Sequence, residues 1–212
     1  MKIIITESQY KLITEREDEK NIQEVNEILN LFMDKLNNGD FSFSEFGREK
    51  IIKVRVDTKF RELNIILKSE QNENINGQYV LPTITSLIPT IVIYNCHFRG
   101  MDVNINNKIR TIKHEIVHFI DDRKKRIKSY DSSDLDKYHN NAHEINAEFI
   151  AITNQILLKN NIPNTFGEFL KLYKTFSHFD LLNDKNKKSL IGRLYQYYIH
   201  LKDKQKEDNR TS

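Results

Sequence analysis

Two histidines four residues apart, with a glutamate beside the first, have the spacing in this chain that most directly suggests chemistry. His114, Glu115 and His118 lie in the apolar stretch TIKHEIVHFIDD, at residues 111–122. On an α-helix, residues four apart project from one face, so the two imidazoles can converge on one ion. Zinc favours such nitrogen ligands, and a catalytic zinc keeps one position open for water. Glu115 is then placed to take a proton from that water as general base.

A third ligand distinguishes such a site from a buried helix whose two histidines are merely hydrogen-bonded. Asp121 is on the same face, but at 1.5 Å per residue it lies about 10 Å along the axis from His114. That distance is too long for one ion to be shared on an unbroken helix. We therefore expect Asp121 either to orient a histidine or to be an ordinary polar residue near the helix end.

The stretch NNAHEINAEFIAITNQILL, at residues 140–158, offers two carboxylates one helical turn apart, Glu144 and Glu148. Either one, on a helix packed beside the first, completes a set of two histidines and one glutamate. We favour Glu144 as the ligand, with Glu148 accepting a hydrogen bond from a zinc histidine, and the assignment of Glu148 as ligand stays open. The simpler alternative is that both glutamates belong to a solvated helix face.

Several polar side chains in or just after the connector between these helices are candidates to stabilise a developing oxyanion. For each of them, a loop or capping role is the simpler interpretation. The candidates are Tyr130, Tyr138, His139 and His143, of which we favour Tyr138 and His143.

HEIVHFID, followed on a second helix by Glu144-Ile-Asn-Ala147, resembles the gluzincin arrangement of zinc metallopeptidases. It is also similar to short HExxH proteins of large tailed bacteriophages, as are the opening MKIIITESQYKLI and the approach Tyr138-His-Asn-Asn141. The resemblance covers roughly residues 88–158. It implies a zinc ion, the ligands His114, His118 and Glu144, and hydrolysis of peptide bonds. Glu148 stands where the family usually has an acidic residue, with Glu in place of Asp.

Periodicity predicts the elements that must position these residues. Alternating and β-branched runs predict strands at 51–57, 62–69, 78–82 and 88–98, and a short strand at 2–5. Helical spacing predicts helices at 21–38, 106–123, 142–160, 165–177 and 186–203, with further helix starts at Thr6 and, as a capping box, at Thr165. Asn38-Gly39 is expected to close the first long helix.

Together these elements predict an α+β fold in a single domain over residues 1–203. A small mixed or antiparallel sheet would pack on the pair of zinc-binding helices, with further helices at each end of the chain. Residues 204–212, KQKEDNRTS, contain no apolar side chain to bury, so we expect a disordered tail.

Composition narrows the classes of partner. The chain has 212 residues, and 33 Lys and Arg against 30 Asp and Glu leave a net charge of +3, which does not favour a nucleic-acid or membrane partner. The single cysteine, Cys96, excludes an intramolecular disulfide and a cysteine-based zinc cluster. The start lacks the apolar segment of a secretory signal. We therefore expect the chain in the cytoplasm of a host cell, bacterial or phage-encoded, or in a virion, and the oligomeric state stays open.

The expected function is that of a zinc-dependent metallopeptidase acting on a peptide or protein, with an extended substrate bound along an edge strand. Two other classes stay open. One is a virion or accessory structural protein with a non-catalytic metal site. The other is a repressor-cleaving regulatory protease, although the Glu-Ala-x-x-Phe-Ala pattern common in those proteins is missing here. Cleavage of peptidoglycan is the alternative within catalysis.

Overall fold

The chain divides into two compact units. The computed structural model describes residues 7–43, 49–56, 62–72, 76–82, 87–99, 102–124, 138–157 and 162–211. Residues 23–128 form one unit, called here the sheet unit, and residues 1–22 with 129–212 form the other, the helical unit. A single domain over residues 1–203 stays a prediction.

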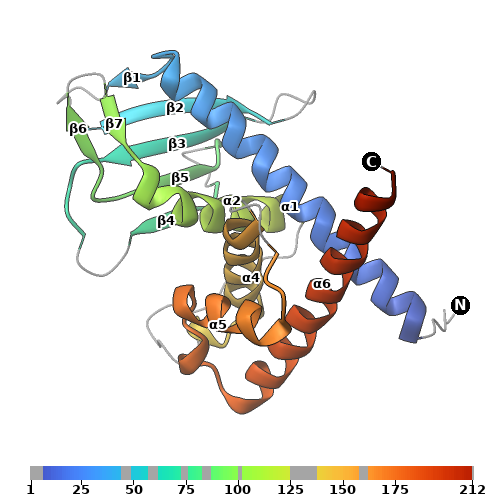
Figure 1. Cartoon of the computed structure of the whole chain (residues 1–212). Coiled ribbons are helices and arrows are strands. Elements are labelled where there is room, and N and C mark those ends of the chain that lie inside the picture. The colour runs from blue at the N-terminus through green and yellow to red at the C-terminus, as the bar shows by residue number, and fades with distance from the viewer. Residues whose placement is uncertain are drawn as a thin grey trace, which may run out of the picture. The chain divides into compact units, whose positions relative to one another are not determined.

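The sheet unit contains a five-stranded mixed sheet, with the strand order β1-β2-β3-β5-β4 (Figure 1). Strands β3 and β5 pair in parallel and the other neighbours pair antiparallel, which confirms a small mixed sheet. The five strands are β1 (Ser42–Phe43), β2 (Glu49–Arg55), β3 (Glu62–Lys68), β4 (Gly77–Val80) and β5 (Thr90–Ile93). Strands β6 (His97–Arg99) and β7 (Asp102–Asn104) form a separate antiparallel pair.

Alternation in the sequence produces the buried face of this sheet. Every second residue of β3 is fully buried, as are Ile52 and Val54 of β2, because successive side chains of a strand point to opposite faces. The helix α2 (Ile109–Arg123) follows a short 3₁₀ turn, η1 (Asn106–Lys108), and packs against β4 and β5. The predicted helix at 106–123 is thus confirmed, except that residues 106–108 form a 3₁₀ turn instead of α-helix.

The helix α1 (Glu7–Asn37) begins in the helical unit and ends in the sheet unit. Its second half buries Val25, Ile28 and Phe32 at helical spacing, as predicted for 21–38. The helix closes at a Schellman motif in which the Gly39 and Asp40 amides donate to the carbonyls of Leu36 and Lys35, at 3.2 and 2.8 Å. Gly39 has φ 73°, the left-handed conformation that favours glycine. The strand predicted at 2–5 and the helix start predicted at Thr6 lie outside the described residues.

The helical unit is formed by the start of α1 and by α4 (Ala142–Leu157), α5 (Phe166–Phe176), η2 (Phe179–Leu181) and α6 (Asp184–Thr211). The capping box at Thr165 is confirmed: its hydroxyl accepts from the Glu168 amide at 3.2 Å, and the Glu168 carboxylate accepts from the Thr165 amide at 3.3 Å. The buried aromatic side chains of this unit include Phe149, Phe169, Tyr173 and Tyr197.

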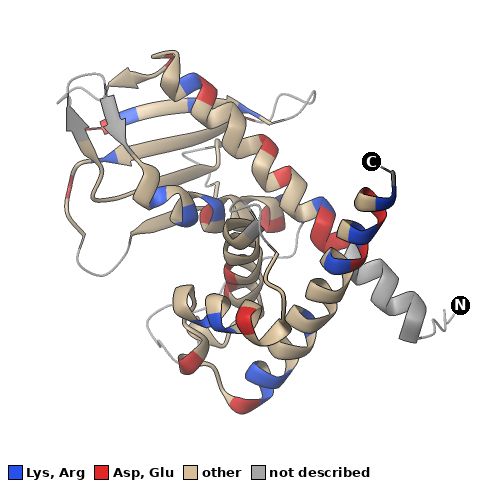
Figure 2. Ribbon diagram, viewed as in Figure 1, with Lys and Arg blue, Asp and Glu red and all other residues tan. Residues whose placement is uncertain are grey.

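The C-terminal segment differs from the disordered tail predicted for 204–212, because α6 continues to Thr211. Its residues alternate in charge (Figure 2). Lys206 pairs with Asp203 at 3.2 Å, and Lys204 reaches Glu19 of α1 at 3.3 Å. The Lys206–Asp203 pair is at helical spacing, which stabilises a helix that has no apolar face to bury, and the Lys204–Glu19 pair joins α6 to α1. None of the described helices combines the length and the apolar character needed to cross a bilayer.

Candidate metal centre

The two motif histidines lie side by side on α2. The Nε2 atoms of His114 and His118 are 3.1 Å apart, and their ring centroids are 4.8 Å apart. His118 is buried and His114 half-buried. Two nitrogens bound to one tetrahedral zinc ion, each at about 2.05 Å, are about 3.3 Å apart. The pair therefore has the spacing that a shared zinc ion requires.

Glu115 is buried at the contact between α2 and the start of β4. A Cβ atom added to Gly77 would lie 3.1 Å from Cγ and 3.2 Å from Oε1 of Glu115, and 2.5 Å from Cγ2 of Thr111. The backbone of Gly77 is outside the left-handed region, so its φ does not demand a glycine. A glycine is required at this position because there is no space for a side chain. Any added side chain would push the strand away from Thr111 and Glu115.

Residues 76–79, from the residue before β4 to its third residue, contact one stripe of η1 and α2. The Lys108 ammonium donates to Oδ1 of Asn76 at 2.9 Å, directly before Gly77. Two residues beyond Gly77, Tyr79 packs on Phe119, with ring centroids 6.3 Å apart, and its hydroxyl donates to Asp122 at 2.8 Å. The stripe positions are spaced three or four residues apart: Lys108, Thr111, Glu115, Phe119 and Asp122.

Around the axis of α2, this stripe lies between the two histidines on one side and the buried core residues on the other. At 100° per residue, His114 and His118 are centred about 80° from the stripe, whereas the buried Ile112, Ile116 and Ile120 are centred about 100° away in the opposite direction. Strand β4 pairs with β5 on one side and forms an end of the described sheet. The residues of α2 are thus sorted into a core face, a strand face and a histidine face.

Lys113, next to His114, is a fully buried cation on the core side of α2. Burial lowers the pKa of its ammonium group to about 8. The side chain therefore loses much of its positive charge just above neutral pH. The burial of this lysine could not be predicted from the sequence, because nothing in the local pattern distinguishes it from a solvated residue.

Glu144 lies in the first turn of α4, in the helical unit, and is buried at 5% exposure. The turn is held by Asn141, whose Oδ1 accepts from the His143 amide at 2.8 Å, as an N-cap residue does. A carboxylate near a helix N-terminus is stabilised in its charged form by the helix dipole. The charged form is also the one that binds zinc.

Glu148, one turn further along α4, is engaged by a residue that the sequence did not point to. Its Oε1 accepts from the His178 amide at 2.8 Å and lies 3.0 Å from His178 Nδ1. The ring of His178 lies 5.0 Å from that of His139, and Tyr138 packs edge-on against His139. His178 lies between α5 and η2, 30 residues from Glu148, so no local spacing could have predicted the pair.

The remaining candidate on α2, Asp121, is buried at 2% exposure. This burial separates it from an ordinary solvated residue at a helix end, because carboxylates are rarely buried without partners. Its role in orienting a histidine stays a prediction, as do the roles of Tyr138 and His143 in stabilising an oxyanion. Tyr130 lies outside the described residues.

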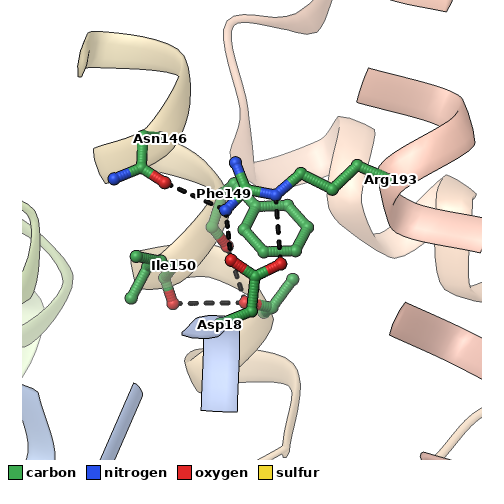
Figure 3. A network of polar contacts seen from close by, with 6 residues as sticks. Asp18, Asn146, Phe149, Ile150 and Arg193 are labelled. Atoms are coloured by element: carbon green, nitrogen blue, oxygen red, sulfur yellow. Dashed lines mark hydrogen bonds and ion pairs between the residues drawn. The ribbon is translucent and has the colours of Figure 1, made fainter. Parts of the chain in front are cut away.

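A network around Arg193 ties α4 to its neighbours in the helical unit (Figure 3). The guanidinium of Arg193, on α6, donates to both carboxylate oxygens of Asp18 on α1, at 2.5 and 3.2 Å. It also donates to Oδ1 of Asn146 at 2.9 Å and lies 3.8 Å from the ring centre of Phe149. Asn146 is two residues after Glu144, so this network fixes the turn of α4 that carries Glu144.

Comparisons with protein-family models, curated proteins and solved structures found no match for this chain.

Proposed function

We propose that this chain is a zinc-dependent metallopeptidase in which His114, His118 and Glu144 bind zinc and Glu115 is the general base. The observation that carries the proposal is the 3.1 Å separation of the two histidine Nε2 atoms on one face of α2. The same distance suits a hydrogen bond between the two rings in the metal-free chain, so the metal content of the protein distinguishes a zinc site from a core helix.

Two observations favour Glu144 as the third ligand over Glu148. Glu144 is buried in the first turn of α4, where the helix N-terminus favours a charged carboxylate. The Glu148 carboxylate, in contrast, is already an acceptor for two donors of His178. A carboxylate engaged in this way has to lose those hydrogen bonds before it binds a metal ion.

The chemistry assigned to the chain's residues is proton transfer and positioning. When bound, zinc supplies a Lewis acid that lowers the pKa of water toward about 7. Glu115 accepts the proton of the attacking water and passes it to the leaving amine, as general base and then general acid. Its burial against Gly77 keeps the carboxylate in one place, which lowers the entropic cost of that transfer.

The edge strand β4 supports a peptide as the substrate class. An extended peptide can add to a sheet edge by main-chain hydrogen bonds, whatever its sequence. Glu115 contacts the first residue of β4, so a peptide paired with this strand would pass the general base. This arrangement favours hydrolysis of a peptide bond in an extended segment.

The test is the metal content of purified protein, measured by inductively coupled plasma mass spectrometry for the wild type, Glu144→Ala and Glu148→Ala. We expect about one zinc per chain in the wild type, a large loss with Glu144→Ala, and retention with Glu148→Ala. The two variants are matched, since both truncate a glutamate on one face of α4.

Three outcomes would contradict the proposal. Loss of zinc with Glu148→Ala alone would overturn the assignment of Glu144, and no zinc in any version would overturn the metallopeptidase. Zinc at full occupancy without cleavage of any member of a peptide library would indicate a structural metal site instead.

A further inference from the structure

A cavity of about 330 Å³ opens in the sheet unit just beyond the end of β4. Its apolar wall is formed by Pro82, Leu87, Pro89 and Phe119. Leu87 is 82% exposed, which leaves a large apolar side chain in contact with solvent. The cavity therefore presents apolar surface to whatever enters it.

The polar part of the cavity is mainly acidic. Glu62 and Asp122 contribute carboxylates, and Arg123 contributes the one positive charge among the described lining residues. The Arg123 guanidinium is paired with Glu24, which also pairs with Lys124 at 3.3 Å. The charge of Arg123 is therefore balanced in part by Glu24, which is not among the described lining residues.

The carboxylate of Asp122 is held in position by its neighbour on β4. Burial and the Asp122 carboxylate both raise the pKa of the Tyr79 hydroxyl, so the hydroxyl stays protonated and donates to Asp122 at 2.8 Å. This donor is neutral and fixes the carboxylate without neutralising it. Glu62 is the first residue of β3 and is paired cross-strand with Arg55 of β2, so the two side chains lie on the same face of the sheet.

We propose that this cavity binds the side chain of a lysine or arginine in the peptide substrate. The apolar wall fits the aliphatic stem of such a side chain, and Glu62 and Asp122 offer acceptors to its charged end. A purely aliphatic side chain would make no ion pair with either carboxylate, and an acidic one would be repelled.

The position of the cavity sets its distance from the reacting bond. Asp122 is seven residues beyond Glu115 on α2, which is about 10 Å along the helix axis. An extended peptide rises about 3.3 Å per residue, so the basic residue lies about three residues from the cleaved bond. The three-residue distance rests on the proposed function, because it is measured from the bond that Glu115 would cleave. Binding of the basic side chain does not depend on catalysis.

The test measures peptide binding by fluorescence anisotropy with the full-length Glu115→Gln variant, which keeps the proposed zinc ligands. The probe is a labelled, extended peptide of Ser, Thr and Val with one central lysine. In the control peptide, norleucine replaces lysine and keeps the stem without the charge. We expect the lysine peptide to bind about tenfold more tightly at low salt.

The difference should vanish when Glu62→Gln and Asp122→Asn are added. Both amides keep the size of the side chain, and the amide oxygen introduced by Asp122→Asn can still accept from Tyr79. The matched control is Glu70→Gln, an exposed carboxylate outside the cavity, which should leave the preference intact. Circular dichroism confirms that each variant is folded.

Equal binding of the two peptides, a preference that survives the double substitution, or no binding of either peptide would overturn the inference. The proposed function fails separately. Cleavage without a preference for a basic residue would overturn the basic-side-chain site and leave the proposed peptidase intact. Lysine-selective binding without zinc or cleavage would overturn the peptidase and leave the basic-side-chain site intact.

Discussion

Glu115 has two neighbours that decide what it can do: the histidine pair on its own helix and the backbone of Gly77 on β4. The histidine spacing could be predicted from the sequence, because a helix fixes the geometry of residues four apart. The contact with Gly77 could not, because it joins residues far apart in the chain through the pairing of β4 with the sheet. The partner of Glu148, His178, was hidden for the same reason.

Glu115→Gln removes the proton acceptor while keeping the size of the side chain and leaving the three proposed ligands untouched. We expect kcat to fall by a factor of about 10² to 10⁴, the usual contribution of a general base, with zinc content unchanged. The measurement pairs single-turnover cleavage of a library-derived peptide with metal analysis of the same preparation. Full activity in this variant would show that Glu115 is not the general base.

Gly77→Ala tests whether close approach of β4 holds Glu115. The added Cβ meets Thr111 and Glu115 at distances that force the strand or the side chain to shift. We expect a loss of about 1–3 kcal/mol in the free energy of unfolding, as for overpacking, measured by urea denaturation. We also expect kcat to fall while the zinc content stays at the wild-type level.

The matched control for this variant is Gly192→Ala on α6, where an added Cβ meets nothing within 4 Å. Because alanine is the better helix former, that substitution should be neutral or slightly stabilising. If Gly77→Ala unfolds at the same urea concentration as the wild type and keeps its kcat, then the space beside Glu115 has no role in positioning it.

Among the elements, α4 matters most because it carries Glu144 and Glu148. The Arg193 network anchors it through Asn146 and the ring of Phe149, and Asn141 caps its start. Strands β2 and β3 and the capping box of α5 were predictable, because alternation and capping residues are local signals. The end of α6 was not, because its outer turns lack the apolar periodicity that marks a buried helix.

The Arg193–Asp18 pair should contribute a measurable coupling between α6 and α1. Its two hydrogen bonds are charge-assisted and bidentate, a geometry that is stronger than an ordinary surface ion pair. In a double-mutant cycle of Arg193→Gln and Asp18→Asn, we expect a coupling of about 1–2 kcal/mol in the free energy of unfolding. A coupling below about 0.3 kcal/mol would mean that the pair does not hold the helices together.

At the scale of the whole molecule, the α+β class with a mixed sheet could be predicted, since the strand and helix periodicities separate cleanly along the chain. The separation into a sheet unit and a helical unit could not be predicted, because no feature of the sequence marks the boundary between them. The boundary at residues 22–23 falls inside α1, where composition does not change and no glycine or proline marks a linker. A continuous helix hides a boundary that a loop would reveal.

Zinc, if the proposal holds, binds the folded chain and stabilises it by mass action. At a free zinc concentration of about 1,000 times Kd, this contributes about 4 kcal/mol, which for a chain of this size raises Tm by about 8–16 °C. Differential scanning calorimetry of the zinc-loaded protein, before and after removal of zinc by a chelator, measures the shift. Glu115→Gln should keep the full shift because it removes no ligand, whereas Glu144→Gln should lose most of it. An equal shift in those two variants would mean that Glu144 contributes nothing to the site, and would return Glu148 as the candidate ligand.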